Sequence, residues 1–147
     1  MRFVVLQHTA WPGHAPHFDL MLQMEAGADD RDLVLKTFAT LTDEFPDGKS
    51  HADARARNAA AGNPVAQTNL LRLLADHRRA YLSFEGALSG GRGQVVRVEE
   101  GELVYRCAPD TGLQELRFHL QGRKLKGDYR LRHMGGGTYV FERMRRG

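Results

Sequence analysis

The stretch His17-Phe18-Asp19-Leu20-Met21-Leu22-Gln23-Met24 alternates between apolar residues and residues of a second, mostly polar kind. Successive side chains of a β-strand point to opposite faces, so this alternation predicts a strand over residues 17–25. Every second residue from Phe18 to Met24 is apolar, and this face is expected to pack in the core. The opposite face starts with an imidazole and a carboxylate two residues apart, which makes it a candidate ligand-binding face.

Runs with the same alternation lie on both sides of this stretch. They predict strands at residues 2–8, 32–39, 80–86, 93–99, 102–107, 113–120, 123–133 and 138–144. Turn sequences rich in glycine separate them, for example at 89–93 and 135–137. Eight or nine antiparallel strands in 147 residues favour a small closed or nearly closed barrel, because closure leaves no exposed strand edge. The expected fold class is therefore all-β, in a single domain spanning residues 1–147.

Two segments interrupt the strand pattern. Residues 40–66 lack alternation, but Ser50 to Asp53 can cap a helix that ends near Gly62. A second short helix is expected at residues 69–77, where leucines recur at helical spacing. We expect both helices to flank the barrel.

Cysteine content and the N-terminal sequence restrict the compartment. The single cysteine, Cys107, excludes a disulfide within the chain and fits a reducing environment. The apolar run at the N-terminus is too short for a signal peptide or a membrane span. We therefore expect a cytoplasmic monomer with no membrane partner.

The net charge of +3 hides an asymmetry between the two parts of the chain. Residues 1–50 hold 4 Lys and Arg against 8 Asp and Glu, whereas residues 51–147 hold 17 against 10. Much of the basic excess lies near the C-terminus, at Arg117, Arg123, Lys124, Lys126, Arg130, Arg132, Arg143, Arg145 and Arg146. Such clustering is typical of proteins that bind polyanions, and a solvated basic sheet face is the alternative.

His8 ends the first alternating run, and a turn at Pro12-Gly13 can return the chain antiparallel to that run. His8 then lies close to His17 and Asp19. Two imidazoles and one carboxylate leave about three positions on a six-coordinate ion for phosphate oxygens and water. We therefore predict a divalent-metal site at these three residues; the alternative is a pair of buried, hydrogen-bonded histidines.

Four fragments go beyond generic β-structure: Phe3 to His8, His17 to Leu22, Asp76 to Gly86, and Leu116 to Leu131. In this order they resemble the 3'-phosphoesterase domain that accompanies bacterial DNA ligase D, the ligase of non-homologous end joining, and that also occurs as a stand-alone protein. The resemblance covers nearly the whole chain. It implies a small barrel flanked by short helices.

The resemblance also implies an activity. Family members remove 3'-terminal ribonucleosides and 3'-phosphates from DNA ends during repair, leaving a 3'-hydroxyl for a polymerase or ligase. The expected partners are therefore 3' ends of DNA or RNA-tailed DNA, and a separate ligase or polymerase. By resemblance the metal is manganese, held by His8, His17 and Asp19, although this ligand set also accepts iron, cobalt or zinc.

Two further residues match the family pattern at positions that handle the scissile phosphate. His77 has an unperturbed pKa close to neutrality, so it could stabilise charge on the phosphate or protonate the leaving oxygen. Tyr81 could donate a hydrogen bond to a phosphate oxygen. A cation at a helix C-terminus is the alternative for His77, and a place in the core is the alternative for Tyr81.

One departure from the family concerns the phosphate pocket. Two positions after the aspartate the family places an arginine that grips the phosphate, and here that residue is Met21. Methionine cannot form the bidentate hydrogen bonds of a guanidinium. The sequence offers several basic residues to replace it without choosing among them: Arg72, Arg79, Arg92 and Arg132.

Two other functions stay open at this point. The first is a catalytically weak or inactive family member that binds nucleic-acid ends, with an affinity that falls steeply with salt. The second is a non-haem iron oxygenase, which also uses two histidines and a carboxylate. In that layout a later histidine, His119 or His133, would complete the ligand set.

Overall fold

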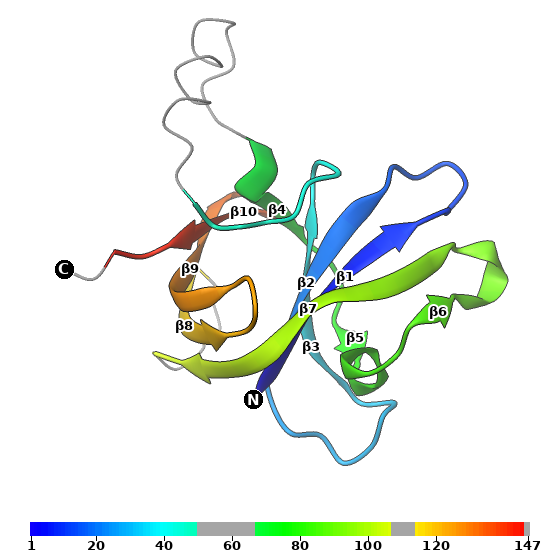
Figure 1. Ribbon diagram of the computed structural model, residues 1–147, viewed down its shortest axis with the longest axis horizontal. Helices are drawn as coiled ribbons and strands as arrows, with labels where there is room; N and C mark the ends of the chain where they lie inside the picture. The colour runs from blue at the N-terminus through cyan, green and yellow to red at the C-terminus, as the bar shows by residue number, and fades with distance from the viewer. Residues whose placement is uncertain (50–66, 107–113, 146–147) are drawn as a thin grey trace, which may run out of the picture.

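A computed structural model describes residues 1–49, 67–106 and 114–145, and strands dominate these residues (Figure 1). The strands are β1 (Arg2–Thr9), β2 (His17–Gln23), β3 (Leu33–Thr40), β4 (Leu70–Leu73), β5 (His77–Arg78), β6 (Gly86–Ala87), β7 (Gln94–Tyr105), β8 (Glu115–Gln121), β9 (Lys126–Gly135) and β10 (Thr138–Arg143). Three short 3-10 turns accompany them: η1 (Gln67–Asn69), η2 (Arg79–Leu82) and η3 (Ser89–Gly91).

Eight of these strands close into an antiparallel barrel. The order around it is β1-β2-β3-β4-β10-β9-β8-β7, and pairing between β1 and β7 closes the ring. The two remaining strands lie outside it: β5 pairs with β3, and β6 pairs with β7 (Figure 1). The predicted all-β barrel of about eight strands is thus confirmed.

The barrel interior is filled by the apolar face that the alternation predicts. Phe18, Leu20 and Leu22 of β2 point inward and join one buried cluster with residues such as Phe118 and Phe141. The fully buried side chains include several phenylalanines and leucines from every side of the ring. Burial of this apolar surface is the main stabilising contribution to the barrel.

A second apolar cluster lies on the outer face of the barrel. It consists of Val4, Leu6, Met21, Val34, Leu35, Leu82 and Val95, with Tyr81 and Leu88 packed against it. The sequence predicts one core face for β2, but both faces are buried, since Met21 is 1% and Gln23 8% exposed. The segment containing η2 supplies Tyr81 and Leu82, and this packing is what buries the outer side of β2.

The predicted break between strands 93–99 and 102–107 is wrong. One strand, β7, runs without interruption from Gln94 to Tyr105 through Gly101. Gly101 pairs with Phe3 instead of turning, and a Cβ at this position would collide with the backbone carbonyl of Gln121. The glycine therefore permits close strand packing at this point.

The predicted helix at 69–77 and strand at 80–86 are also wrong. Residues 70–73 form β4, which pairs with both β3 and β10 and places Leu71 in the core. Residues 79–82 form the 3-10 turn η2, and only the short strands β5 and β6 flank it. Cross-strand pairing overrides local spacing in both places.

The remaining helix prediction, from Ser50 to Gly62, lies outside the described residues, as does Cys107. The helical elements that the structure does describe are turns of three or four residues. Within the described ranges, no helix has the length and apolar character needed to cross a lipid bilayer.

Candidate metal centre

Strand pairing brings the three predicted ligands together. β1 and β2 are antiparallel neighbours in which His8 pairs with His17, and Leu6 pairs with Asp19. The loop between them turns at Gly13, whose φ of 81° lies in the left-handed region. All three ligands lie on the outer face of the barrel, because their neighbours Phe18 and Leu20 point inward. The predicted antiparallel return is confirmed.

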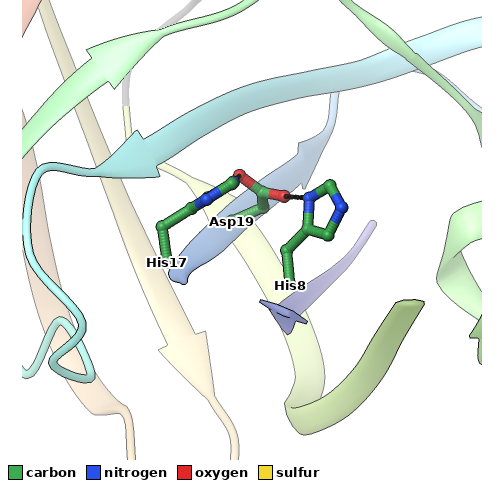
Figure 2. A group of neighbouring side chains, drawn as sticks. All are labelled: His8, His17 and Asp19. Atoms are coloured by element: carbon green, nitrogen blue, oxygen red, sulfur yellow. Dashed lines mark ion pairs between the residues drawn. The ribbon is translucent and has the colours of Figure 1, made fainter. Parts of the chain in front are cut away.

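The Asp19 carboxylate lies between the two imidazoles (Figure 2). Its Oδ1 is 3.2 Å from Nε2 of His17, and its Oδ2 is 3.9 Å from Nδ1 of His8. One nitrogen from each histidine and one carboxylate oxygen lie within 4.8 Å of one another. A single cation can contact three atoms so placed.

Backbone carbonyls fix which nitrogen of each histidine is available. Nε2 of His8 lies 2.7 Å from the carbonyl oxygen of Arg92, and Nδ1 of His17 lies 3.1 Å from that of Ala15. A carbonyl only accepts, so these nitrogens carry the hydrogen and donate it. The opposite nitrogens, which are the ones beside Asp19, are left with lone pairs. Orienting contacts of this kind are typical of metal-ligating histidines.

Asp19 is buried yet incompletely satisfied. The residue is 4% exposed, and while His17 is neutral, with its hydrogen on Nδ1, Oδ1 has no hydrogen-bond donor within the part of the chain that the structure describes. Burying a carboxylate oxygen without a partner is costly. A divalent cation would supply that partner, and two imidazoles with one carboxylate suit manganese, iron, cobalt or zinc. The residues present therefore fit a metal ion.

Several effects shift the pKa of His17 in opposite directions. The Asp19 carboxylate beside its ring raises the pKa of His17 above the ordinary value, whereas burial and the positive charge of Arg72 lower it. The effect of the carboxylate is the largest, so the net shift in the pKa of His17 is upward. Because a ligand imidazole must lose its proton, metal binding here competes with protonation.

A pocket of about 270 Å³ joins this centre to the predicted phosphate-handling residues. Its walls include the metal triad, His77 and Tyr81. The rings of His77 and Tyr81 meet edge to face at 5.6 Å between centroids. Nδ1–H of His77 donates to the carbonyl of Ala75 at 2.8 Å, which leaves Nε2 for another partner. The structure thus brings together all five residues.

The position at which the resembled family has an arginine is apolar here. Met21 lines the same pocket together with Leu74, Leu88 and Val95. Its side chain belongs to the outer apolar cluster and is almost fully buried. Any cation that grips a phosphate here must therefore come from another strand or loop.

The four candidate arginines differ in what their guanidinium groups contact. That of Arg79 is bound to Asp30 at 3.2 Å and to two backbone carbonyls, and that of Arg132 is bound to Glu142 at 3.0 Å. Arg132 stands on β9, which is four strands from β2 in either direction around the ring. Arg92 lines the pocket, but its guanidinium donates to the carbonyl and hydroxyl of Ser89. Arg72 lies on β4 and is exposed.

Several contributors to the site were not predicted. Trp11 lines the pocket and stacks on His8 at 5.2 Å and on His14 at 3.5 Å between ring centroids. The guanidinium of Arg78 lies 5.9 Å from the ring of Tyr81. Trp11 could have been noticed because it stands between two predicted ligands. The orienting carbonyls have no counterpart in the sequence, since every residue has one.

Ion pairs engage three arginines of the predicted basic cluster, Arg117, Arg130 and Arg132, where β8, β9 and β10 lie side by side. Arg130 bridges Glu115 and Glu142 at 3.3 and 3.1 Å, and Arg117 also contacts Glu115. These contacts favour a solvated, internally neutralised sheet face for this part of the cluster. Its charge is therefore a weaker indication of a polyanion partner than the composition implies.

The two later histidines do not complete the ligand set. His119 on β8 contacts Asp128 at 3.0 Å, and His133 on β9 lies 2.7 Å from the carbonyl of Gly136. Neither residue lines the pocket. The second imidazole beside Asp19 comes from His8, which precedes the aspartate in the chain.

Comparison with known proteins adds nothing to this geometry. No protein-family model matches the chain, and no curated protein matches it. The function must therefore be inferred from the pocket and from the side chains that line it.

Proposed function

We propose that this protein is a divalent-metal-dependent phosphoesterase that removes a 3'-phosphate or a terminal 3'-ribonucleoside from DNA ends. The observation that carries the proposal is the single pocket shared by the metal triad, His77 and Tyr81. The same five residues are the ones that the resemblance to the 3'-phosphoesterase domain selects. Segments separated by about sixty residues in the sequence contribute to it.

The proposed ion is manganese, held by His8, His17 and Asp19, and zinc or cobalt would also suit these ligands. When bound, a divalent ion polarises a phosphoryl group and lowers the pKa of coordinated water. The protein contributes the orientation of the ligands. The carbonyls of Arg92 and Ala15 hold both imidazoles with their lone pairs toward the carboxylate.

His77 and Tyr81 are proposed to act on the phosphate. With Nδ1–H committed to the carbonyl of Ala75, the His77 ring exchanges its second proton at Nε2. In the protonated form it stabilises negative charge on the phosphate or gives that proton to the leaving oxygen. The Tyr81 hydroxyl donates to a non-bridging oxygen, and the edge-to-face contact between the two rings restrains both.

The test is a 3'-end assay on 5'-labelled DNA that carries either a 3'-phosphate or one terminal ribonucleotide. We expect turnover with Mn²⁺, none with excess EDTA, and a loss of about 100-fold or more in His77→Ala, because positioned acid–base groups contribute roughly 10²–10⁴. His133→Ala is the matched control and should keep wild-type turnover, since that histidine is outside the pocket. No turnover of either substrate by the wild type would reject the proposal.

A non-catalytic protein that binds nucleic-acid ends is the second candidate. The apolar side chain of Met21 in the pocket favours it, because the site lacks the family's phosphate-gripping arginine. Retained binding of DNA ends that weakens with salt, without turnover, would select this candidate.

A further inference from the structure

A row of outward-facing residues leads from the metal centre to Arg72. Asp19 on β2 pairs with Ala39 on β3, and Ala39 pairs with Arg72 on β4. Paired residues on neighbouring strands lie on the same face of a sheet. The flanking residues Phe38 and Leu71 point into the barrel, so the row lies on the outer face.

This geometry gives the Arg72 side chain access to the metal centre. Neighbouring strands lie about 4.8 Å apart, so the Cα atoms of Asp19 and Arg72 are separated by roughly 10 Å. Ala39 lies between them and contributes only a methyl group. A long arginine side chain can span most of this distance.

Arg72 is also the candidate whose guanidinium is not engaged by any residue that the structure describes. Its side chain is exposed and forms no hydrogen bond or ion pair with the residues that the structure describes. The guanidinium groups of Arg79, Arg92 and Arg132 are engaged by a carboxylate, by carbonyls or by a hydroxyl. Forming a new contact would require those groups to leave their partners.

We infer that Arg72 binds a non-bridging oxygen of the scissile phosphate by reaching across Ala39. This inference rests on the proposed phosphoesterase function and identifies the residue that replaces the arginine absent at Met21. A guanidinium presents a planar pair of donors that matches two phosphate oxygens. The phosphate is then held from the β4 side of the pocket. The apolar wall around Met21 contacts the uncharged parts of the nucleotide that carries this phosphate.

The decisive experiment measures binding of inorganic phosphate to the Mn²⁺-loaded protein by titration calorimetry. Arg72→Gln should weaken phosphate binding about 10- to 100-fold, the usual effect of losing a charge-assisted hydrogen bond. Arg72→Lys should give an intermediate value, because it keeps the charge and loses the planar pair of donors. Arg132→Gln removes another exposed arginine, on the opposite side of the barrel, and should match the wild type.

Two further readouts separate phosphate binding from metal binding and from catalysis. Mn²⁺ affinity, followed by quenching of Trp11, the only tryptophan, should be the same in Arg72→Gln and in the wild type. In the 3'-end assay, the loss in Arg72→Gln should fall mainly on KM. The melting temperature of each variant checks that it folds, and Arg72→Lys serves if the glutamine variant does not.

The outcomes distinguish this inference from the function on which it rests. Phosphate binding that is equal in Arg72→Gln and the wild type, or absent from the wild type, would overturn the role of Arg72. Wild-type protein that binds phosphate through Arg72 but turns over neither DNA substrate would instead reject the phosphoesterase function.

Discussion

Two buried carboxylates of this protein, Asp19 and Glu99, differ in how their oxygens are satisfied. Glu99 is 3% exposed and accepts four backbone N–H groups, from Glu100 and Arg123 at Oε1 and from Lys124 and Leu125 at Oε2, all within 3.0 Å. Asp19 is 4% exposed, and while His17 is neutral, with its hydrogen on Nδ1, its Oδ1 has no hydrogen-bond donor among the described residues.

The difference separates a structural carboxylate from a candidate ligand. Glu99 holds the turn between β8 and β9 in place, and every acceptor position that faces the protein is used. Asp19 has two imidazole lone pairs beside it and an oxygen still to be satisfied. Burial alone therefore does not make a carboxylate a candidate ligand; an oxygen left unsatisfied by the protein does.

The largest expected effect concerns Asp19→Asn, which keeps the size of the side chain and removes its charge. Mn²⁺-dependent turnover should fall by about three orders of magnitude, because a bound ion supplies several kcal/mol of transition-state stabilisation. The 3'-end assay and a Mn²⁺ titration measure both losses. Without metal, the variant should be at least as stable as the wild type, since it no longer buries an incompletely paired charge.

Asp128→Asn is the matched control for this substitution. Asp128 is paired with His119 and Arg106 away from the pocket, so its loss should leave Mn²⁺ affinity unchanged. Equal Mn²⁺ affinity in Asp19→Asn and in the wild type would show that the triad is not a metal site.

The second-largest effect is expected at Glu99, and it concerns the stability of the fold, not metal binding. Glu99→Gln should lower the free energy of unfolding by about 2–3 kcal/mol, because hydrogen bonds to a charged acceptor contribute roughly 1.5–3 kcal/mol and the amide leaves a donor unpaired. Chemical denaturation measures the change. Glu102→Gln, an exposed position on the same strand, should change it by less than about 0.5 kcal/mol. Mn²⁺ affinity should be unaffected in both variants.

The stabilisation by Glu99 should also depend on pH in a defined direction. Burial opposes ionisation of this carboxyl, but the hydrogen bonds from Leu125, Arg123, Lys124 and Glu100 outweigh it and lower the pKa of Glu99 below its ordinary 4.5. A group with a lowered pKa stabilises the fold fully above its unfolded value and loses that contribution as pH falls through the folded value. The stability difference between wild type and Glu99→Gln should therefore shrink below pH 4.5, and a difference that grows there would contradict this account.

The sequence predicted the parts of the fold and site that depend on local pattern. The alternation in residues 17–24 located β2 and its inward face, and the Pro12-Gly13 turn placed His8 beside His17. The sequence-based prediction failed where pairing with segments distant in the chain determines the secondary structure. The leucines at 70–74 suit a helix locally, but pairing with β3 and β10 makes a strand of them.

Non-local packing also explains what was missed around the site. Met21 on the outer face of β2 is buried by side chains some sixty residues later in the chain, and no pattern within β2 predicts them. The reach of the Arg72 side chain toward the metal centre depends on the small residue Ala39 in the neighbouring strand, which only the register reveals. Resemblance to a family supplied His77 and Tyr81, whose place in the pocket no periodicity indicates.

The smallest expected effect is that of Trp11 on Mn²⁺ binding. Trp11 marks a second difference between the surroundings of Asp19 and those of Glu99. Glu99 is held by backbone donors, whereas His8 is supported partly by a side-chain stack with Trp11. An aromatic pair contributes about 0.5–1.5 kcal/mol, so Trp11→Leu should weaken Mn²⁺ binding only about 2- to 10-fold. Calorimetry is the suitable measurement, because this variant has no tryptophan. His14→Ala removes the ring on the far side of Trp11 and should have a smaller effect. A loss as large as that of Asp19→Asn would mean that the stack, more than the carbonyl of Arg92, keeps the lone pair of His8 directed at the metal.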